Sequence, residues 1–301
     1  MKVVHVNSVD VSGGAAIASN RLHTGLRENG IDSREVVARK DTADPTIDAP
    51  SLFSQEVVSR IRSVLDTIPA YLYRGFEEKL FSTAFVPSQT DERVANLDPD
   101  IIHLHWINAG FLRIEELREF DAPLVWTLHD MWPFTGGCHY SGDCTKYKNK
   151  CGNCPMLGEA KESDLSRRIW KRKQEAWDNL DITIVAPSQW LADTARSSSL
   201  FDDSNVHQIP NGIDVSTYRP LPPSTARSLY NISENKHIVL FGAANPDDPR
   251  KGYDFLTKAL AKVENQWEDV ELVTFGSNPI NGGETNLQNV THVGHVDEIG
   301  L

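Results

Sequence analysis

The sequence has no uncharged hydrophobic run near the roughly 20 residues that a membrane-spanning helix needs. Its first residues, Met1–Asn7, form a strand-like run without the charged segment, long apolar stretch and small-residue cleavage site of a signal peptide. We therefore expect a cytoplasmic protein. An excess of positive charge is missing as well. The formal net charge is -12, which opposes binding to phosphate backbones and argues against a nucleic-acid partner.

The dinucleotide-binding glycine pattern G-x-G-x-x-G is also missing after the first predicted strand, which argues against an NAD-dependent dehydrogenase. The turn between the strand Lys2–Asn7 and a helix predicted over Ala15–Asn29 carries Gly13 and Gly14 instead. Exposed amides at the positive end of a helix favour an anion or a hydroxyl-rich ligand. The plainer interpretation is that the two glycines only permit a tight turn.

Cysteine is rare, and all four copies fall in one stretch with the spacing C-x5-C-x6-C-x2-C: Cys138, Cys144, Cys151 and Cys154. In a reducing compartment such a cluster more often binds a metal than forms disulfides. Four thiolates around a tetrahedral zinc ion would staple a loop that has little core of its own. Reduced thiols packed in a loop are the second interpretation, and disulfides are the third.

Strand and helix patterns alternate along the chain as in a doubly wound α/β fold. The strongest strand signals, Ile101–His105 and Pro123–Leu128, deliver polar residues to the carboxyl edge of the sheet, where such folds bind ligands. The candidates at this edge are His105, His129 and Asp130. We expect His103, inside its strand, to be structural, whereas His129 is better placed for chemistry.

Two helical stretches combine apolar and basic residues. Gln55–Phe81 has apolar residues at helical spacing, arginines between them and an interruption at Pro69. Ser163–Leu180 has a basic cluster flanked by Trp170 and Trp177. Either could rest on an anionic membrane surface, at the inner face of the cell membrane. Burial of the first helix against the sheet and a solvated basic face on the second are the favoured interpretations.

Proline-rich composition after the Ile-Pro-Asn-Gly-Ile-Asp segment marks a domain boundary. Residues 1–212 are expected to form one Rossmann-like domain with a cysteine-rich loop at 131–155, and residues 213–301 to begin a second. The second half predicts the strand His237–Gly242, the helix Tyr253–Gln266, the strand Val270–Gly276 and a loop at Asn278–Asn289.

Arg250 and Lys251 directly precede the predicted helix of the second half. Two cations therefore stand where a helix N-terminus already favours phosphate. An exposed basic pair without a ligand is the competing interpretation.

Several motifs occur together: the Gly-Gly turn, the strand ending His-x-His, Trp-Thr-Leu-His-Asp-Met-Trp-Pro-Phe at 126–134, Ala-Pro-Ser-x-Trp-Leu-Ala-Asp at 186–193, Ile-Pro-Asn-Gly-Ile-Asp at 209–214, and Asp-Pro-Arg-Lys-Gly-x-Asp-x-Leu at 248–256. This combination resembles family 4 glycosyltransferases of the GT-B fold, which have two Rossmann-like domains. It is most similar to the exopolysaccharide branch that contains colanic acid transferases. The resemblance extends from Lys2 to Gly294.

The resemblance implies a retaining enzyme that moves a sugar from a nucleotide-diphosphate donor to a glycan or lipid-linked acceptor. By this resemblance, Gly13 and Gly14 match the loop that faces the donor diphosphate, and His129 matches the histidine near the reacting sugar. Lys251, with Arg250 beside it, matches the cation on the diphosphate. His105 and Asp130 are expected near the acceptor. Such enzymes generally need no metal for the transfer, so any zinc would be structural.

The sequence departs from the family pattern in two places. Ala243 and Ala244 follow Gly242 where many relatives have an arginine, a charge that Arg250 would supply here. The acidic E-x7-E region of the family lies beyond Leu301, so we expect an incomplete second domain and little activity from this chain alone. The alternative function is a non-catalytic, zinc-stapled module that binds a glycan or a partner.

Overall fold

The computed structural model describes residues 1–51, 53–76, 80–158, 161–246, 248–263, 269–276 and 290–296. The chain divides into two compact units, Met1–Ile213 and Asp214–Leu301, and each is described by itself below. The loop predicted at Asn278–Asn289, and the end of the helix predicted to reach Gln266, lie outside the described residues.

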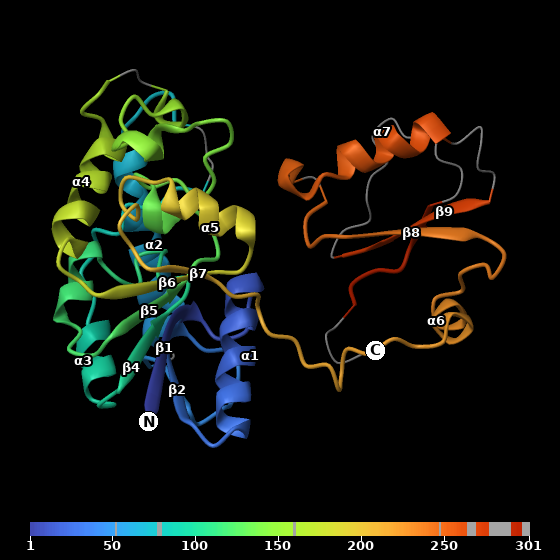
Figure 1. Cartoon of the computed structure of the whole chain (residues 1–301), viewed down its shortest axis with the longest axis horizontal. Coiled ribbons are helices and arrows are strands. Elements are labelled where there is room, and N and C mark those ends of the chain that lie inside the picture. Colours follow the sequence, from blue (N-terminus) through green and yellow to red (C-terminus); the bar gives the residue numbers. More distant parts are fainter. Residues whose placement is uncertain are drawn as a thin grey trace. The chain divides into compact units, whose positions relative to one another are not determined.

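The first unit is built on a parallel sheet of seven strands (Figure 1). In sequence order these are β1 (Lys2–Val9), β2 (Asp32–Arg39), β3 (Ile47–Asp48), β4 (Ile101–Leu104), β5 (Leu124–Thr127), β6 (Ile182–Ala186) and β7 (Val206–Gln208). Their spatial order is β3-β2-β1-β4-β5-β6-β7, so the direction of winding reverses between β1 and β4. Ligands of doubly wound folds bind at the carboxyl ends of the strands beside such a reversal.

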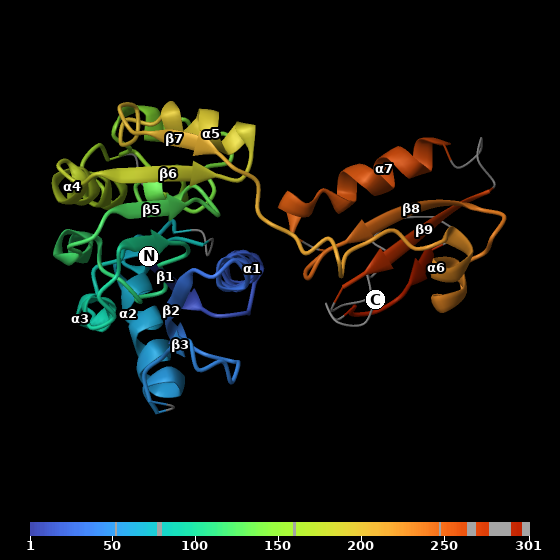
Figure 2. The same ribbon diagram turned by 60° about the horizontal axis from the view of Figure 1, so that its bottom comes forward.

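Helices connect the strands: α1 (Gly14–Glu28), α2 (Ser59–Tyr71), α3 (Thr90–Ala95), α4 (Leu165–Trp177) and α5 (Gln189–Arg196), with a short π-helix at Ser54–Val58 before α2. In both ribbon views α1 lies on one side of the sheet, and α3 and α4 lie on the other (Figures 1 and 2). Side chains fix where two of them begin, because Asp164 accepts from the Arg167 amide and Ser188 accepts from the Leu191 amide.

Three tryptophans form the centre of the core. The rings of Trp126, Trp132 and Trp177 lie 5.3 to 6.3 Å apart between centroids. Each indole N–H donates to a backbone carbonyl 2.9 to 3.0 Å away, so these large side chains are buried without an unpaired donor.

The expectation of a solvated basic face on α4 is wrong for Lys173. This side chain is fully buried, and its ammonium donates to the carbonyl oxygens of Trp132 and Thr135. The same ammonium lies 3.5 Å from the centroid of the Trp132 ring, a cation–π contact. A run of like charges on a helix does not reveal which member faces inward, because long amphipathic side chains bury their methylene stems.

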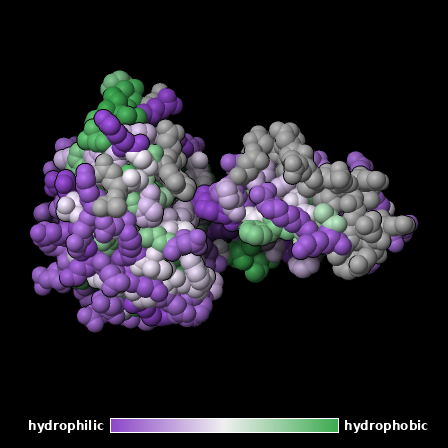
Figure 3. Space-filling view, turned by 90° about the horizontal axis from the view of Figure 1, so that it is seen from above, coloured by the Kyte–Doolittle hydropathy of each residue, from purple (hydrophilic) through white to green (hydrophobic). Residues whose placement is uncertain are grey.

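The expectation that Gln55–Phe81 is buried is confirmed only in part: Ala70 and Phe81 belong to the core, but much of the helix is exposed. Helix α2 continues through Pro69 to Tyr71, and one face is in solvent. Exposed apolar residues at helical spacing cover that face: Val57, Val58, Ile61, Val64, Leu65, Ile68, Tyr71 and Leu72, with exposed fractions from 39% to 79%. We call them the α2 apolar stripe, and a hydrophobic patch protrudes over this helix in Figure 3.

The second unit has a parallel sheet in the order β10-β9-β8, formed by β8 (His237–Gly242), β9 (Val270–Phe275) and β10 (Val290–His292). Helix α6 (Pro223–Leu229) precedes the sheet, and α7 (Tyr253–Val263) connects β8 to β9. The described part of this unit therefore repeats the βαβ pattern of a Rossmann-like fold.

Candidate active site

The loop after β1 leads directly into the N-terminus of α1 at the carboxyl edge of the sheet. Gly13 has φ 95°, in the left-handed region that favours glycine, and both Gly13 and Gly14 are exposed. Asp10 anchors this loop to the segment after β2, because its carboxylate accepts hydrogen bonds from the Asp41 and Thr42 amides, each at 2.9 Å. The first amides of α1 are thus presented on a fixed turn, as the sequence predicts for an anion or sugar ligand.

A row of hydrogen-bonded histidines runs from the interior of the sheet to its carboxyl edge. His5 on β1 pairs in register with His103 on β4, and His105 follows two residues later on the same face. His5 Nδ1 lies 3.1 Å from His105 Nε2, and His105 Nδ1 lies 3.1 Å from His129 Nε2. We call His5, His105 and His129 the histidine row.

The burial of the row determines the direction of its hydrogen bonds. His5 Nε2 is buried and has no partner. Leaving this nitrogen as an unpaired acceptor costs less free energy than burying it as an unpaired N–H donor. The proton of His5 is therefore assigned to Nδ1. His5 then donates to His105, and His105 Nδ1 donates to His129 Nε2. In this arrangement His129 carries its proton on Nδ1, which makes it a hydrogen-bond donor at the carboxyl edge.

The row is neutral around physiological pH. Burial lowers the pKa of His129 to about 4, although the charge of Asp130 opposes the shift. Burial also lowers the pKa of His103 to about 4, and burial together with the neighbouring histidines holds the pKa values of His5 and His105 well below the ordinary value. The structure therefore offers a neutral imidazole and no cationic acid at this edge.

The polar side-chain atoms of Asp130 and His105 form hydrogen bonds to neighbouring residues of the protein. Both oxygens of Asp130 are occupied: Oδ2 accepts from His139 Nδ1 at 2.6 Å and Trp106 Nε1 at 2.9 Å, and Oδ1 accepts from the Trp132 amide at 2.8 Å. His105 uses both ring nitrogens within the histidine row. We therefore interpret both as positioning residues for His129 and its loop. The acceptor contacts expected from the sequence stay a prediction.

Sequence reasoning missed His139 and Trp106. His139 is fully buried and lies 2.9 Å from Ser82 Oγ through Nε2, so it joins the loop after β5 to the segment before α3. The only sequence signal for His139 is its position between the first two cysteines. Nothing in the sequence pairs it with Asp130.

Among the described residues, one histidine group could also hold a metal, since ligand atoms of His5, His103 and His105 all lie within 4.8 Å of one another. Internal hydrogen bonds already use both nitrogens of His105 and one of each neighbour. These contacts explain the cluster without an ion.

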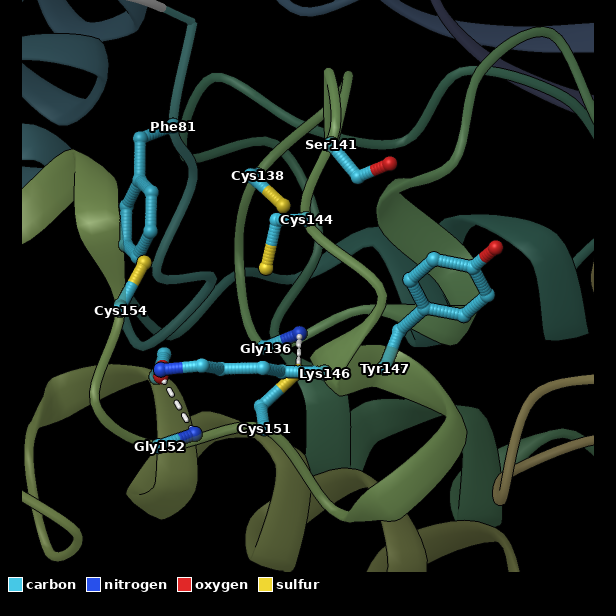
Figure 4. Close-up of a pocket in the computed structure, with 11 residues that line it drawn as sticks. Phe81, Gly136, Cys138, Ser141, Cys144, Lys146, Tyr147, Cys151, Gly152 and Cys154 are labelled. Atoms are coloured by element: carbon cyan, nitrogen blue, oxygen red, sulfur yellow. Dashed lines mark hydrogen bonds between the residues drawn. The ribbon is translucent and has the colours of Figure 1, made fainter.

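The four cysteines are free and surround a small cavity beside this site. All four line a cavity of about 20 Å³ together with Phe81, Gly136, Ser141 and Tyr147 (Figure 4). Burial raises the pKa of Cys138 and of Cys151 to about 12. None of the four cysteines forms a disulfide bond, so the third interpretation from the sequence is not supported.

In the second unit, Arg250 and Lys251 lie in the short helix Pro249–Lys251 that leads through Gly252 into α7. Arg250 Nε donates to Asp248 Oδ1 at 2.9 Å, so its charge is engaged within the loop. Lys251 is exposed. Of the two cations, Lys251 is therefore the better placed to meet a phosphate.

Two Rossmann-like units, the first with a polar site at the carboxyl edge of its sheet, are the arrangement of the GT-B fold. Residues 12–217 match the profile described as Glycosyltransferase Family 4. The chain belongs to this family.

The curated relatives agree with that assignment. The chain is 26% identical over 240 residues to WcaC of Escherichia coli, named as a colanic acid biosynthesis glycosyl transferase, with 74% of this chain and 58% of WcaC covered. It is 26% identical over 302 residues to phosphatidyl-myo-inositol mannosyltransferase of Mycobacterium leprae, with 97% of this chain and 66% of the relative covered. The chain thus spans less than two thirds of the length of either protein.

Solved structures support the fold. Sucrose-phosphate synthase from Thermosynechococcus elongatus matches 99% of this chain and 71% of its own, with a TM-score of 0.58 at 15% identity. Anabaena Alr3699/HepE, solved with UDP and glucose, matches 99% of this chain and 70% of its own, also with a TM-score of 0.58, at 13% identity.

Proposed function

We propose that the chain is part of a retaining glycosyltransferase that moves a sugar from a nucleotide-diphosphate donor to a glycan or lipid-linked acceptor in surface polysaccharide biosynthesis. The observation that carries the proposal is the neutral donor His129, held at the carboxyl edge of a family 4 chain by the histidine row. The name of WcaC supports the polysaccharide role, and UDP in HepE supports the donor class.

Each unit contributes part of the chemistry. In the first unit His129 Nδ1 donates to a hydroxyl of the transferred sugar, and the amides at Gly13 and Gly14 meet the donor diphosphate. In the second unit Lys251 stabilises the negative charge that develops on the leaving diphosphate. Because lysine supplies this charge, the transfer step needs no metal ion. Retention is tested by nuclear magnetic resonance of the product, which must show the same anomeric configuration as the donor sugar.

We expect the chain of 301 residues alone to release nucleoside diphosphate at close to the background rate. The match covers 58% of WcaC, and the described sheet of the second unit has three strands, so few elements of a donor site are present among the described residues. The measurement is coupled detection of nucleoside diphosphate with a panel of sugar donors. A family 4 glycosyltransferase of established activity is the positive control. Release by the chain well above background would contradict the expectation.

A lipid-linked acceptor would place the proposed reaction at the inner face of the cell membrane. No helix in the described part of the chain is both long and apolar enough to cross a bilayer. The α2 apolar stripe is nevertheless in solvent, and exposed Arg60 and Arg74 accompany it. An amphipathic helix with basic flanks buries its apolar face at the surface of an anionic bilayer. We propose that α2 rests there and so brings the site to a lipid-linked acceptor.

Replacing Ile61 and Val64 together by aspartate is expected to lower binding to vesicles that contain anionic phospholipid by about tenfold or more, because two charges enter the buried face. Co-sedimentation measures the bound fraction. Trp190→Ser is the matched control, since Trp190 on α5 is 65% exposed and lies outside the stripe. Equal binding of wild type and double variant would refute membrane docking through α2.

A further inference from the structure

The cysteine loop has room for one ion at its centre. All four cysteines line one cavity of about 20 Å³, and Figure 4 shows their side chains around it. A site of roughly 10–15 Å³ is enough for a single water-sized occupant. No three of the four sulfur atoms lie within 4.8 Å of one another. Tetrahedral zinc with bonds of about 2.3 Å needs sulfurs about 3.8 Å apart, so binding draws the loop inward.

The backbone around the C-x2-C pair is bent in a way that the local sequence does not favour. Lys150, Cys151 and Asn153 have φ of 69°, 55° and 48°, and Gly152 between them has φ of 90°. This left-handed region is unfavourable for residues other than glycine and asparagine. The turn that contains these residues places Cys151 and Cys154 at the same cavity.

A backbone amide is already aimed at one of the sulfur atoms. The Gly136 amide donates to Cys151 Sγ at 3.2 Å. A neutral thiol is a weak acceptor, whereas a thiolate accepts strongly. An added side chain at Gly136 would meet the Ser166 carbonyl oxygen at 2.3 Å, so only glycine lets the loop lie this close to α4.

Lys173 is buried close to the loop. Burial lowers the pKa of its ammonium well below the ordinary value, and negative charge on Cys151 and Cys138 opposes that shift. Four thiolates and one divalent cation carry a net charge of -2, which would favour the charged form of this lysine.

We propose that Cys138, Cys144, Cys151 and Cys154 bind one divalent zinc ion in a closed, structural site. On binding, four S–H bonds break, four protons leave to solvent, and four zinc–sulfur bonds form without a change in oxidation state. Four protein ligands leave no open position, so the ion has no part in the sugar transfer. Its role is to fix the loop that carries His139, whose ring holds Asp130 beside the histidine row.

The first measurement is the zinc content of the protein purified without chelator. We expect about one zinc ion per chain by elemental mass spectrometry, and less than about a tenth of that in the Cys151→Ser/Cys154→Ser variant. Ser141→Ala is the matched control, because Ser141 lines the same cavity without being a ligand, and it should keep the metal.

A second measurement covers the case in which the cysteine variant fails to fold. Wild-type protein stripped of metal and given Co²⁺ should develop the thiolate-to-cobalt charge-transfer band and the visible bands of a tetrahedral tetrathiolate site, and Zn²⁺ should erase them. Zn²⁺ should also raise the midpoint of thermal unfolding of the stripped protein. Wild-type protein that carries no zinc, shows no tetrathiolate cobalt spectrum and has four thiols freely reactive in the native state would overturn the proposal.

Discussion

Replacing His129 with alanine is expected to slow sugar transfer by about 100- to 1000-fold, the usual effect of removing one preorganised donor from a reacting centre. The side chain is the outward end of a row in which each histidine fixes the ring of the next. Its loss should lower kcat more than it changes KM, because a donor aligned with the reacting sugar acts mainly in the transition state. The measurement is the rate of nucleoside diphosphate release by the native enzyme and by the His129→Ala variant.

His103→Asn is the matched control. His103 stacks on His105 at 4.4 Å between ring centroids, but its Nε2 pairs with Thr127 inside the sheet. We expect a loss of no more than about threefold. The wild-type rate should show no step from His129 between pH 6 and 8, because this imidazole has a pKa of about 4 and stays neutral there. Equal losses in the two variants would show that the histidines only support the fold.

Hydrophobic periodicity predicted most of the elements that position the site. Strand β8 has the predicted bounds, and β1 and α1 differ from them by one or two residues at their ends. These elements combine a local hydrophobic pattern with residues that mark where an element begins, such as the glycines at the start of α1. Strand β3 and helices α3 and α6 have two to seven residues each, too few for a period to emerge, and the sequence reading missed them.

The contacts within the site could not be predicted in the same way. The sequence singled out His105, His129 and Asp130 by their place after strands, and the structure brings them together. It could not assign Asp130 to His139 or Lys173 to two carbonyl oxygens, because those pairs join segments that meet only after the sheet has formed. The α2 apolar stripe shows the same limit: an amphipathic pattern predicts a helix but does not say what covers its apolar face.

Glu35 makes the stability of the first unit depend on pH in the reverse of the usual carboxylate sense. Its side chain on β2 is fully buried, Oε1 accepts from Ser19 Oγ at 2.8 Å, and Oε2 has no partner. Burial raises the pKa of Glu35 to about 8, with smaller contributions from the charges of Asp10 and Asp44. The folded chain therefore keeps this proton up to about pH 8, whereas the unfolded chain releases it near its ordinary value of 4.5.

Glu35→Gln is therefore expected to be more stable than wild type at pH 8 to 9 and close to it at pH 4 to 5. Between the two pKa values the unfolded state binds fewer protons, so the free energy of unfolding falls as pH rises, by about 1.4 kcal/mol per unit and on the order of 5 kcal/mol in total. The neutral amide of glutamine removes this loss while retaining the contact with Ser19. Urea unfolding across pH 4.5 to 9 measures the difference, and exposed Glu119→Gln is the control. A difference between Glu35→Gln and wild type that does not change with pH would show that Glu35 is ionised in the folded protein.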